Sequence, residues 1–174
     1  TLVTFLTHPS AYYRDRAREL LIQRKALDIK DQLTRIFDQA QDYKIQAGIL
    51  WTLEGLGLMD TTWTKKGLDK GNAQLHLTLL KLIEQYPMEE KIPGWLDRLC
   101  VNKNLKLAAL PLVQKRMTQN SFYYQWLSNL EIEFSKDNDI KDAIIKTVNG
   151  YEQNYLPFST TLKPALNAVL AKKK

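Results

Sequence analysis

The chain has 174 residues, of which 44% are hydrophobic and 25% are charged. This balance is typical of an ordinary folded domain and excludes a disordered or low-complexity segment. Seven Gly and six Pro are too few for a loop-rich β-sandwich. The formal net charge of +6 includes three lysines at the end of the chain, so it is weak evidence for a nucleic-acid partner.

Apolar residues recur at helical spacing along nearly the whole chain, and no long stretch alternates as a strand would. In chain order, the sequence predicts helices that begin at Ser10, cover 29–39, begin at Asp42, cover 60–70, begin at Asn72, cover 92–101, begin at Asn104, cover 122–134, begin at Asp139 and cover 163–172. Every second helix therefore opens with Ser, Asp or Asn, whose side-chain oxygen can accept a free backbone N–H.

The helices that begin at Asp42, Asn72, Asn104 and Asp139 also resemble one another, at steps of 30, 32 and 35 residues. Such a period is typical of helix pairs that cannot bury their apolar faces alone and therefore stack. The predicted fold is all-α, a right-handed α-α superhelix of about five HEAT- or armadillo-like repeats. We interpret residues 1–174 as a single repeat domain and, because the chain begins with Thr1, as a fragment of a larger multidomain protein.

Three local patterns refine this prediction. Pro111 falls inside an apolar helical run and is expected to kink it. Gly55 and Gly57 follow a helix rather than a strand, so they predict a helix C-cap and not a phosphate loop. Asn149 and Gly150 are expected to end a helix, before a longer connection that reaches about residue 164.

The sequence predicts no catalytic, cofactor-binding or metal-binding residues in this domain. His8 is expected in a turn and His76 on a helix surface, and neither lies at metal-ligand spacing from a second ligand. Cys100 lies in an amphipathic pattern, which favours a buried structural thiol. The apolar runs are too short to span a membrane.

Aromatic and charged residues on the second helices of the first two repeats form the candidate interaction site. They are Tyr12, Tyr13, Arg14, Arg18, Lys44, Trp51 and Glu54. Second helices usually line the concave face of such stacks, and aromatic residues with Arg are enriched in binding hot spots. The same residue types also stack on bases, or simply pack the repeats together.

Two stretches are more specific than the generic repeat. Residues 6–24 contain a His-Pro, an aromatic pair, Arg-Asp and then Leu-Leu, and residues 47–58 contain Ile-Leu-Trp-Thr-Leu-Glu-Gly-Leu-Gly. Together they resemble the HEAT segment of large bacterial proteins, found in planctomycetes and their relatives and in Bacteroidetes. Those proteins join a sorbosone-dehydrogenase-like β-propeller to a haem-binding cytochrome c domain.

The resemblance implies a periplasmic or other extracytoplasmic setting, with any redox chemistry in domains that this chain lacks. It places Tyr12, Tyr13, Arg14, Asp15, Trp51 and Glu54 in the family's motifs. In a purely structural role, Arg14 would pair with a neighbouring carboxylate and Trp51 would enter the core.

The leading hypothesis is a non-catalytic scaffold or protein-interaction module within a larger redox protein of dehydrogenase or cytochrome c type. Its partners would be the neighbouring propeller and cytochrome c domains or another protein, and no cofactor is expected in this domain. One alternative is a HEAT-like DNA-binding protein or DNA glycosylase for alkylated bases, although nucleic acid is not the expected partner. A second alternative is a free-standing adaptor that binds a peptide or protein.

Overall fold

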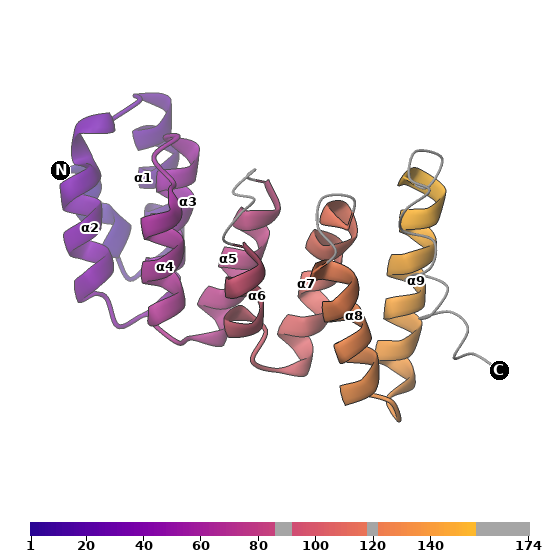
Figure 1. Ribbon diagram of the computed structural model, residues 1–174. Helices are drawn as coiled ribbons and strands as arrows, with labels where there is room; N and C mark the ends of the chain where they lie inside the picture. Colours follow the sequence, from indigo (N-terminus) through magenta and orange to yellow (C-terminus); the bar gives the residue numbers. More distant parts are fainter. Residues whose placement is uncertain (86–91, 118–121, 156–174) are drawn as a thin grey trace. The chain divides into compact units, whose positions relative to one another are not determined.

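The structure is a computed structural model that describes residues 1–85, 92–117 and 122–155 (Figure 1). Every regular element within these ranges is a helix, which confirms the predicted all-α class. The chain divides into two compact units, an N-terminal unit, Thr1–Met88, and a C-terminal unit, Glu89–Lys174.

The N-terminal unit consists of two layers of helices preceded by a short 3-10 helix. Its elements are η1 (Leu2–Thr7), α1 (Ala11–Gln23), η2 (Leu27–Ile29), α2 (Lys30–Gln39), α3 (Tyr43–Gly55), α4 (Thr61–Asp69) and α5 (Ala73–Gln85). One layer contains α1, α3 and α5, with α3 packed against both α1 and α5. The other layer contains α2, which packs on α3, and α4, which packs on α5. The 3-10 helix η1 covers the outer end, where it contacts α1, α2 and α3.

The core of this unit lies between the two layers. Leu33 and Phe37 from α2 and Leu53 from α3 are completely buried, and Trp63 from α4 lies edge-on to Phe37 with ring centroids 5.5 Å apart. Edge-to-face packing is a favourable geometry for aromatic rings. The alternation of apolar and polar residues at helical spacing thus directs one stripe of each helix inward, as the sequence predicts.

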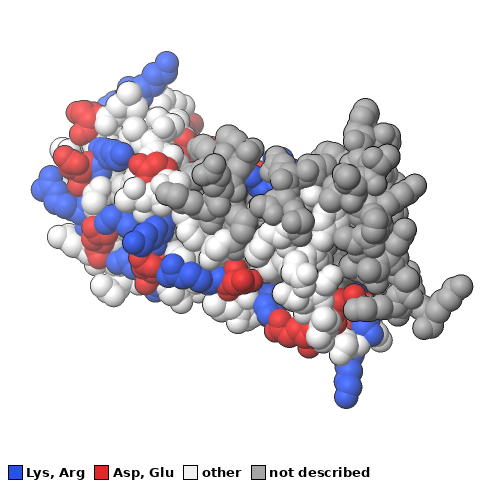
Figure 2. All heavy atoms as spheres, viewed as in Figure 1, with Lys and Arg blue, Asp and Glu red and all other residues white. Residues whose placement is uncertain are grey.

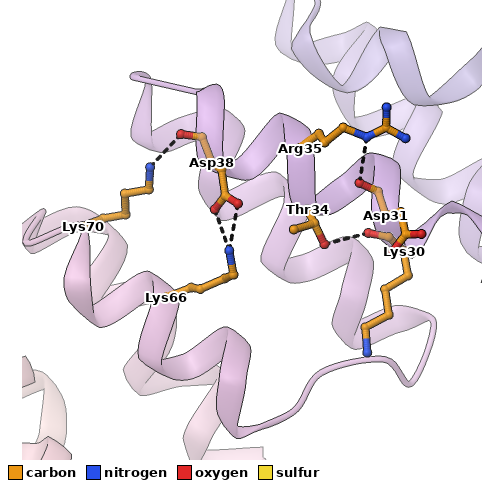
Figure 3. Close-up of polar contacts among 7 residues, drawn as sticks. All are labelled: Lys30, Asp31, Thr34, Arg35, Asp38, Lys66 and Lys70. Atoms are coloured by element: carbon orange, nitrogen blue, oxygen red, sulfur yellow. Dashed lines mark hydrogen bonds and ion pairs between the residues drawn. The ribbon is translucent and has the colours of Figure 1, made fainter.

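Polar contacts join α2 to α4 at the surface of this layer (Figure 3). The ammonium of Lys66 donates to both carboxylate oxygens of Asp38 at 2.8 Å, and Lys70 donates to the Asp38 backbone carbonyl at 3.0 Å. Both lysines also lie over aromatic rings, Lys66 over Trp63 at 5.9 Å and Lys70 over Phe37 at 5.6 Å from the centroid. Since Asp38 is near the end of α2, Lys70 also complements the negative end of that helix.

Glycine allows two of these helix pairs to approach closely. A Cβ at Gly67 in α4 would lie 2.9 Å from Cδ1 of Leu79 in α5, and a Cβ at Gly55 in α3 would overlap the side chain of Ile22 in α1. Leu79 is fully buried, whereas Ile22 is only half-buried. The α4–α5 contact is therefore the less tolerant of the two.

The C-terminal unit repeats the two-layer arrangement. Its described elements are α6 (Ile92–Leu99), α7 (Lys103–Arg116), α8 (Phe122–Glu133) and α9 (Asn138–Tyr155). Helix α9 packs against α7 and α8. The indole N–H of Trp126 in α8 donates to the Asp97 carboxylate of α6 at 3.0 Å, which joins the other layer in the same way that Lys66 and Asp38 join α4 to α2.

The predicted caps of the N-terminal unit are confirmed for two of three helices. The Asp42 carboxylate accepts the N–H of the second residue of α3 at 2.8 Å. The Asn72 side chain accepts the N–H groups of the second and third residues of α5 at 2.9 and 3.2 Å. Ser10 occupies the N-cap position of α1, but its side chain makes no capping hydrogen bond.

The predicted caps of the C-terminal unit were each two residues too late. Helix α7 is capped by Asn102, which accepts from the backbone of Leu105 at 3.0 Å, and not by Asn104. Helix α9 is capped by Asp137 and not by Asp139. The Asp137 Oδ1 accepts the backbone N–H of Asp139 at 3.1 Å. Each error arose where two residues of the capping class stand two positions apart. With Asn102 as the cap, the steps from Asp42 to Asn72 and from Asn72 to Asn102 are both thirty residues.

Helix ends provide a further test. Gly57 has φ +68°, and the N–H of Leu58 donates to the Leu53 carbonyl at 2.8 Å, which is the hydrogen bond of a Schellman cap. The predicted C-cap is thus confirmed. The prediction that Asn149 and Gly150 end a helix was wrong, because α9 continues to Tyr155 and a helix tolerates an interior glycine at modest cost.

Two other predictions concern α7 and the end of the chain. Pro111 lies inside α7, as expected, and its ring is exposed. The helix predicted over 163–172, and the end of the connection predicted to reach residue 164, lie outside the described residues.

Candidate functional site

Helices α1 and α3 bring four of the seven candidate residues around one cavity of about 240 Å³. Arg14 and Arg18 come from α1, one helical turn apart, and Lys44 and Trp51 come from the facing side of α3. The two stretches that carry the family resemblance, residues 6–24 and 47–58, supply most of this lining. Residues far apart in the sequence therefore meet because α1 and α3 lie side by side.

Arg14 is fixed by the turn that precedes its own helix. Its Nη1 donates to the backbone carbonyls of His8 and Pro9, both at 2.7 Å, and the Ser10 N–H donates to Nδ1 of His8 at 3.0 Å. These bonds use carbonyl groups that α1 does not reach, so Arg14 closes the turn. The expectation that Arg14 pairs with a carboxylate was wrong, because the backbone oxygens of its own turn are nearer and otherwise unpaired.

The other two cations of the cavity differ in their surroundings. Arg18 forms an ion pair of 3.2 Å with Asp15, one turn earlier on α1. The Arg18 side chain is 32% exposed and that of Asp15 62% exposed, so the pair is well hydrated. Lys44 is exposed, and among the described residues no carboxylate lies within ion-pair distance of its ammonium. The cavity therefore has three cationic side chains against one carboxylate.

Small and apolar residues form the rest of the lining. They are Leu6 from η1, Ala11 from α1, and Ala47 and Gly48 from α3. Trp51 is half-buried at this cavity, so the expectation that it enters the core was wrong. Ala47 and Gly48, one turn before Trp51, have short or no side chains. The space beside the Trp51 ring is therefore an open cavity and not a packed interior.

The remaining candidates lie elsewhere. Tyr12 is 70% exposed and lines a second, shallower cavity with Asp15, Arg16 and Arg18. Tyr13 is 49% exposed and packs edge-on to the His8 ring at a centroid distance of 4.6 Å. These two neighbouring tyrosines therefore lie outside the lining of the α1–α3 cavity.

Glu54 is also absent from that lining, and its side chain is half-buried near the end of α3. The sequence did not point to Leu6, Ala11, Ala47 or Gly48, which form the small and apolar part of the cavity lining. A glycine in the middle of a predicted helix is the signal that could have drawn attention to this position, because glycine weakens a helix unless space is needed there.

Comparison with known proteins finds no matching family model, no matching curated protein and no matching solved structure.

The C-terminal unit contains a second polar region, centred on Lys103 and Asp137. The ammonium of Lys103 donates to the Asp137 carboxylate at 2.5 Å. This hydrogen bond, together with the backbone N–H of Ile140, holds the pKa of Asp137 below its usual value, and the same bond raises the pKa of Lys103. Asp137 also caps α9, so these charges fix the start of a helix.

Cys100 and His76 are interior residues. Burial raises the pKa of the Cys100 thiol to about 12, which leaves it protonated and unreactive at neutral pH, as expected of a structural thiol. His76 was expected on the surface, but it is only 3% exposed and its Nε2 lies 3.2 Å from the Leu68 carbonyl. The ring fills the α4–α5 interface, which its helical position alone did not reveal.

Within residues 1–85, 92–117 and 122–155, no three His, Cys, Asp or Glu side chains are grouped so that they could hold a metal ion. None of the helices in the described part of the chain combines the length and the apolar character that crossing a membrane requires.

Proposed function

We propose that this chain is a non-catalytic helical-repeat module that binds a protein partner at the cavity between α1 and α3. The observation that supports this most directly is the convergence of Arg14, Arg18, Lys44 and Trp51 on one open cavity. Arginine and tryptophan are enriched among the residues that dominate protein interfaces, especially where they line a partly desolvated pocket.

The repeat architecture is part of this proposal. Capping residues at Asp42, Asn72 and Asn102 recur every thirty residues, and both units have two layers of helices. Such units are expected to continue as a right-handed superhelix of about five HEAT-like repeats, with α1 and α3 on its concave face. That arrangement would present the cavity to a partner.

The setting is proposed from the resemblance of residues 6–24 and 47–58. It places the module in an extracytoplasmic redox protein, between a propeller and a cytochrome c domain. The partner would then be a neighbouring domain of the same polypeptide. The alternative of a free-standing adaptor predicts the same cavity with a partner encoded elsewhere.

The DNA-binding alternative gains no support from the charge distribution. On the face of the N-terminal unit drawn in Figure 2, Lys and Arg are interspersed with Asp and Glu. Several cations of the N-terminal unit are paired, such as Lys66 with Asp38 and Arg16 with Glu19. A DNA-binding groove needs a continuous row of cations along the phosphate backbone.

Site-specific photo-crosslinking tests the proposal in cells that make the full-length protein. Benzoylphenylalanine in place of Trp51 keeps an aromatic ring at the cavity, and the same residue in place of exposed Lys65 on α4 is the matched control. We expect a discrete protein adduct from position 51 and none from position 65. Mass spectrometry of the adduct then distinguishes a neighbouring domain from a separate protein. No adduct at position 51, or equal adducts at both positions, would contradict the proposal.

A further inference from the structure

We propose that the α1–α3 cavity selects an acidic peptide segment, with a carboxylate between Arg18 and Lys44 and an adjoining apolar or aromatic side chain against Trp51. This inference rests on the proposed function and deepens it by naming the chemistry of the partner. It follows from three features of the cavity: its charge, the space left open at Gly48, and the small area over which its cations are spread.

Charge is the first feature. Three cationic side chains and one carboxylate line a cavity of about 240 Å³. Arg14 is held by backbone carbonyls and Arg18 by a hydrated ion pair, so both are positioned before any ligand arrives. Lys44 is exposed and adds a cation that no described carboxylate neutralises. An incoming carboxylate can therefore form charge-assisted hydrogen bonds without displacing a buried ion pair.

The space left open at Gly48 is the second feature. Gly48 is in the middle of α3, where glycine costs about 1 kcal/mol relative to alanine. At Gly55 and Gly67 a neighbouring helix occupies the space of the missing side chain, but at Gly48 nothing lies within 4 Å of the position of a Cβ. The missing side chain thus opens the cavity beside Trp51, which suits an apolar ligand side chain.

The small area over which the cations are spread is the third feature, and it favours a peptide over a nucleic acid as the ligand. The three cations lie around one small cavity, and five of its nine lining residues are apolar or glycine. A phosphate backbone carries a charge every few ångströms and needs a row of cations to follow it. One or two carboxylates beside an apolar side chain match the cavity instead.

Two variants test this inference without weakening the fold. Lys44→Glu reverses the charge in the first turn of α3, where an acidic residue favours the helix. Gly48→Leu fills the space at that position with a strong helix former and leaves the charge unchanged. Lys65→Glu makes the same charge reversal on α4, outside the cavity, and is the matched control.

The purified chain would be used to select peptides from a random library displayed on phage. We expect the selected peptides to be enriched in Asp or Glu next to Phe, Trp or Leu. Synthetic copies should bind the wild-type chain and the Lys65→Glu variant equally in fluorescence polarisation. Lys44→Glu and Gly48→Leu should each weaken binding about tenfold, as removal of a favourable contact of an ordinary hot-spot residue does. Binding should also weaken as sodium chloride is raised.

Several results would overturn the inference. They are selected peptides without acidic residues, no selection at all, equal binding by all four proteins, or tight binding of a random-sequence DNA duplex that Lys44→Glu abolishes. A crosslinked protein partner at position 51 together with any of these results would leave the proposed function intact and reject only the acidic chemistry. Failure of the crosslink together with selection of acidic peptides would reject the proposed protein partner and leave the acidic chemistry of the cavity intact.

Discussion

Lys25 stands where the backbone favours glycine. It follows the end of α1 with φ 48°, and the N–H of Ala26 donates to the Leu21 carbonyl at 3.2 Å. This is the same type of cap that Gly57 makes after α3. In the left-handed region the Cβ of an L-residue crowds the following carbonyl, which costs about 1–2 kcal/mol.

Replacement of Lys25 by Gly should therefore raise the free energy of unfolding, by about 0.5–1 kcal/mol after the greater backbone entropy of glycine is subtracted. The Lys25 side chain is exposed, so little contact is lost. Urea denaturation followed by circular dichroism measures the change. Arg24→Gly is the matched control, because Arg24 has φ −80° and glycine there should destabilise. Equal effects at both positions would show that backbone strain is not the cause.

At this scale the sequence predicted which residue types matter better than it predicted their surroundings. It drew attention to Arg14 and Trp51, yet it placed Arg14 with a carboxylate and Trp51 in the core. Arg14 instead bonds to carbonyls of the turn at His8 and Pro9, and such carbonyls are available in any sequence. The exposure of Trp51 depends on small residues of α1 and α3 that face it, which only the packing reveals.

At the scale of elements, the helices and their alternation follow from apolar spacing alone, whereas a choice between two capping residues that stand two positions apart does not. Asn102 and Asn104 are chemically identical, and the sequence favoured Asn104 because its following residues match the repeat. The structure selects Asn102, whose side chain accepts the Leu105 N–H while the Asn102 backbone is extended. Both residues belong to the capping class, so the residue type alone does not decide which of the two starts the helix.

Asn102→Ala should accordingly lower the free energy of unfolding of the C-terminal unit by about 1 kcal/mol, the usual cost of a lost N-cap. Asn104→Ala should have little effect or stabilise slightly, because Asn104 is an exposed position inside the first turn of α7 and alanine is the better helix former. Thermal unfolding of the two variants makes the comparison. A larger loss of unfolding free energy from Asn104→Ala than from Asn102→Ala would show that Asn104 caps the helix.

At the scale of the molecule, the all-helical class could be predicted because every segment has helical periodicity, and the division into two units could not. Each unit has its own buried core, with Leu53 and Leu79 in the N-terminal unit and Val113 and Leu127 in the C-terminal unit. Periodic spacing shows that helices stack but carries no information on how the helices group into units. That depends on which side chains meet.

Two separate cores predict that damage to one unit leaves the other closed. Gly67→Ala places a methyl group 2.9 Å from the fully buried Leu79 side chain and should destabilise the N-terminal unit by about 1–3 kcal/mol. Amide hydrogen exchange at Leu79 should then accelerate. Cys100, the single cysteine of the chain, is buried in the C-terminal unit and reports its opening through thiol labelling in urea. We expect the labelling rate to stay unchanged, since opening of the N-terminal unit exposes a different core.

The matched variant is Val113→Ala, which removes methyl groups from a fully buried position of the C-terminal unit. It should accelerate labelling of Cys100 and leave exchange at Leu79 unchanged, because cavity formation weakens the core in which it occurs. If Gly67→Ala instead accelerated labelling of Cys100 by the same factor as exchange at Leu79, the chain would unfold as one cooperative body. The two-unit division would then describe packing density and not stability. If labelling of Cys100 stayed unchanged in Gly67→Ala, the α1–α3 cavity would belong to a unit whose stability can be altered without opening the C-terminal unit.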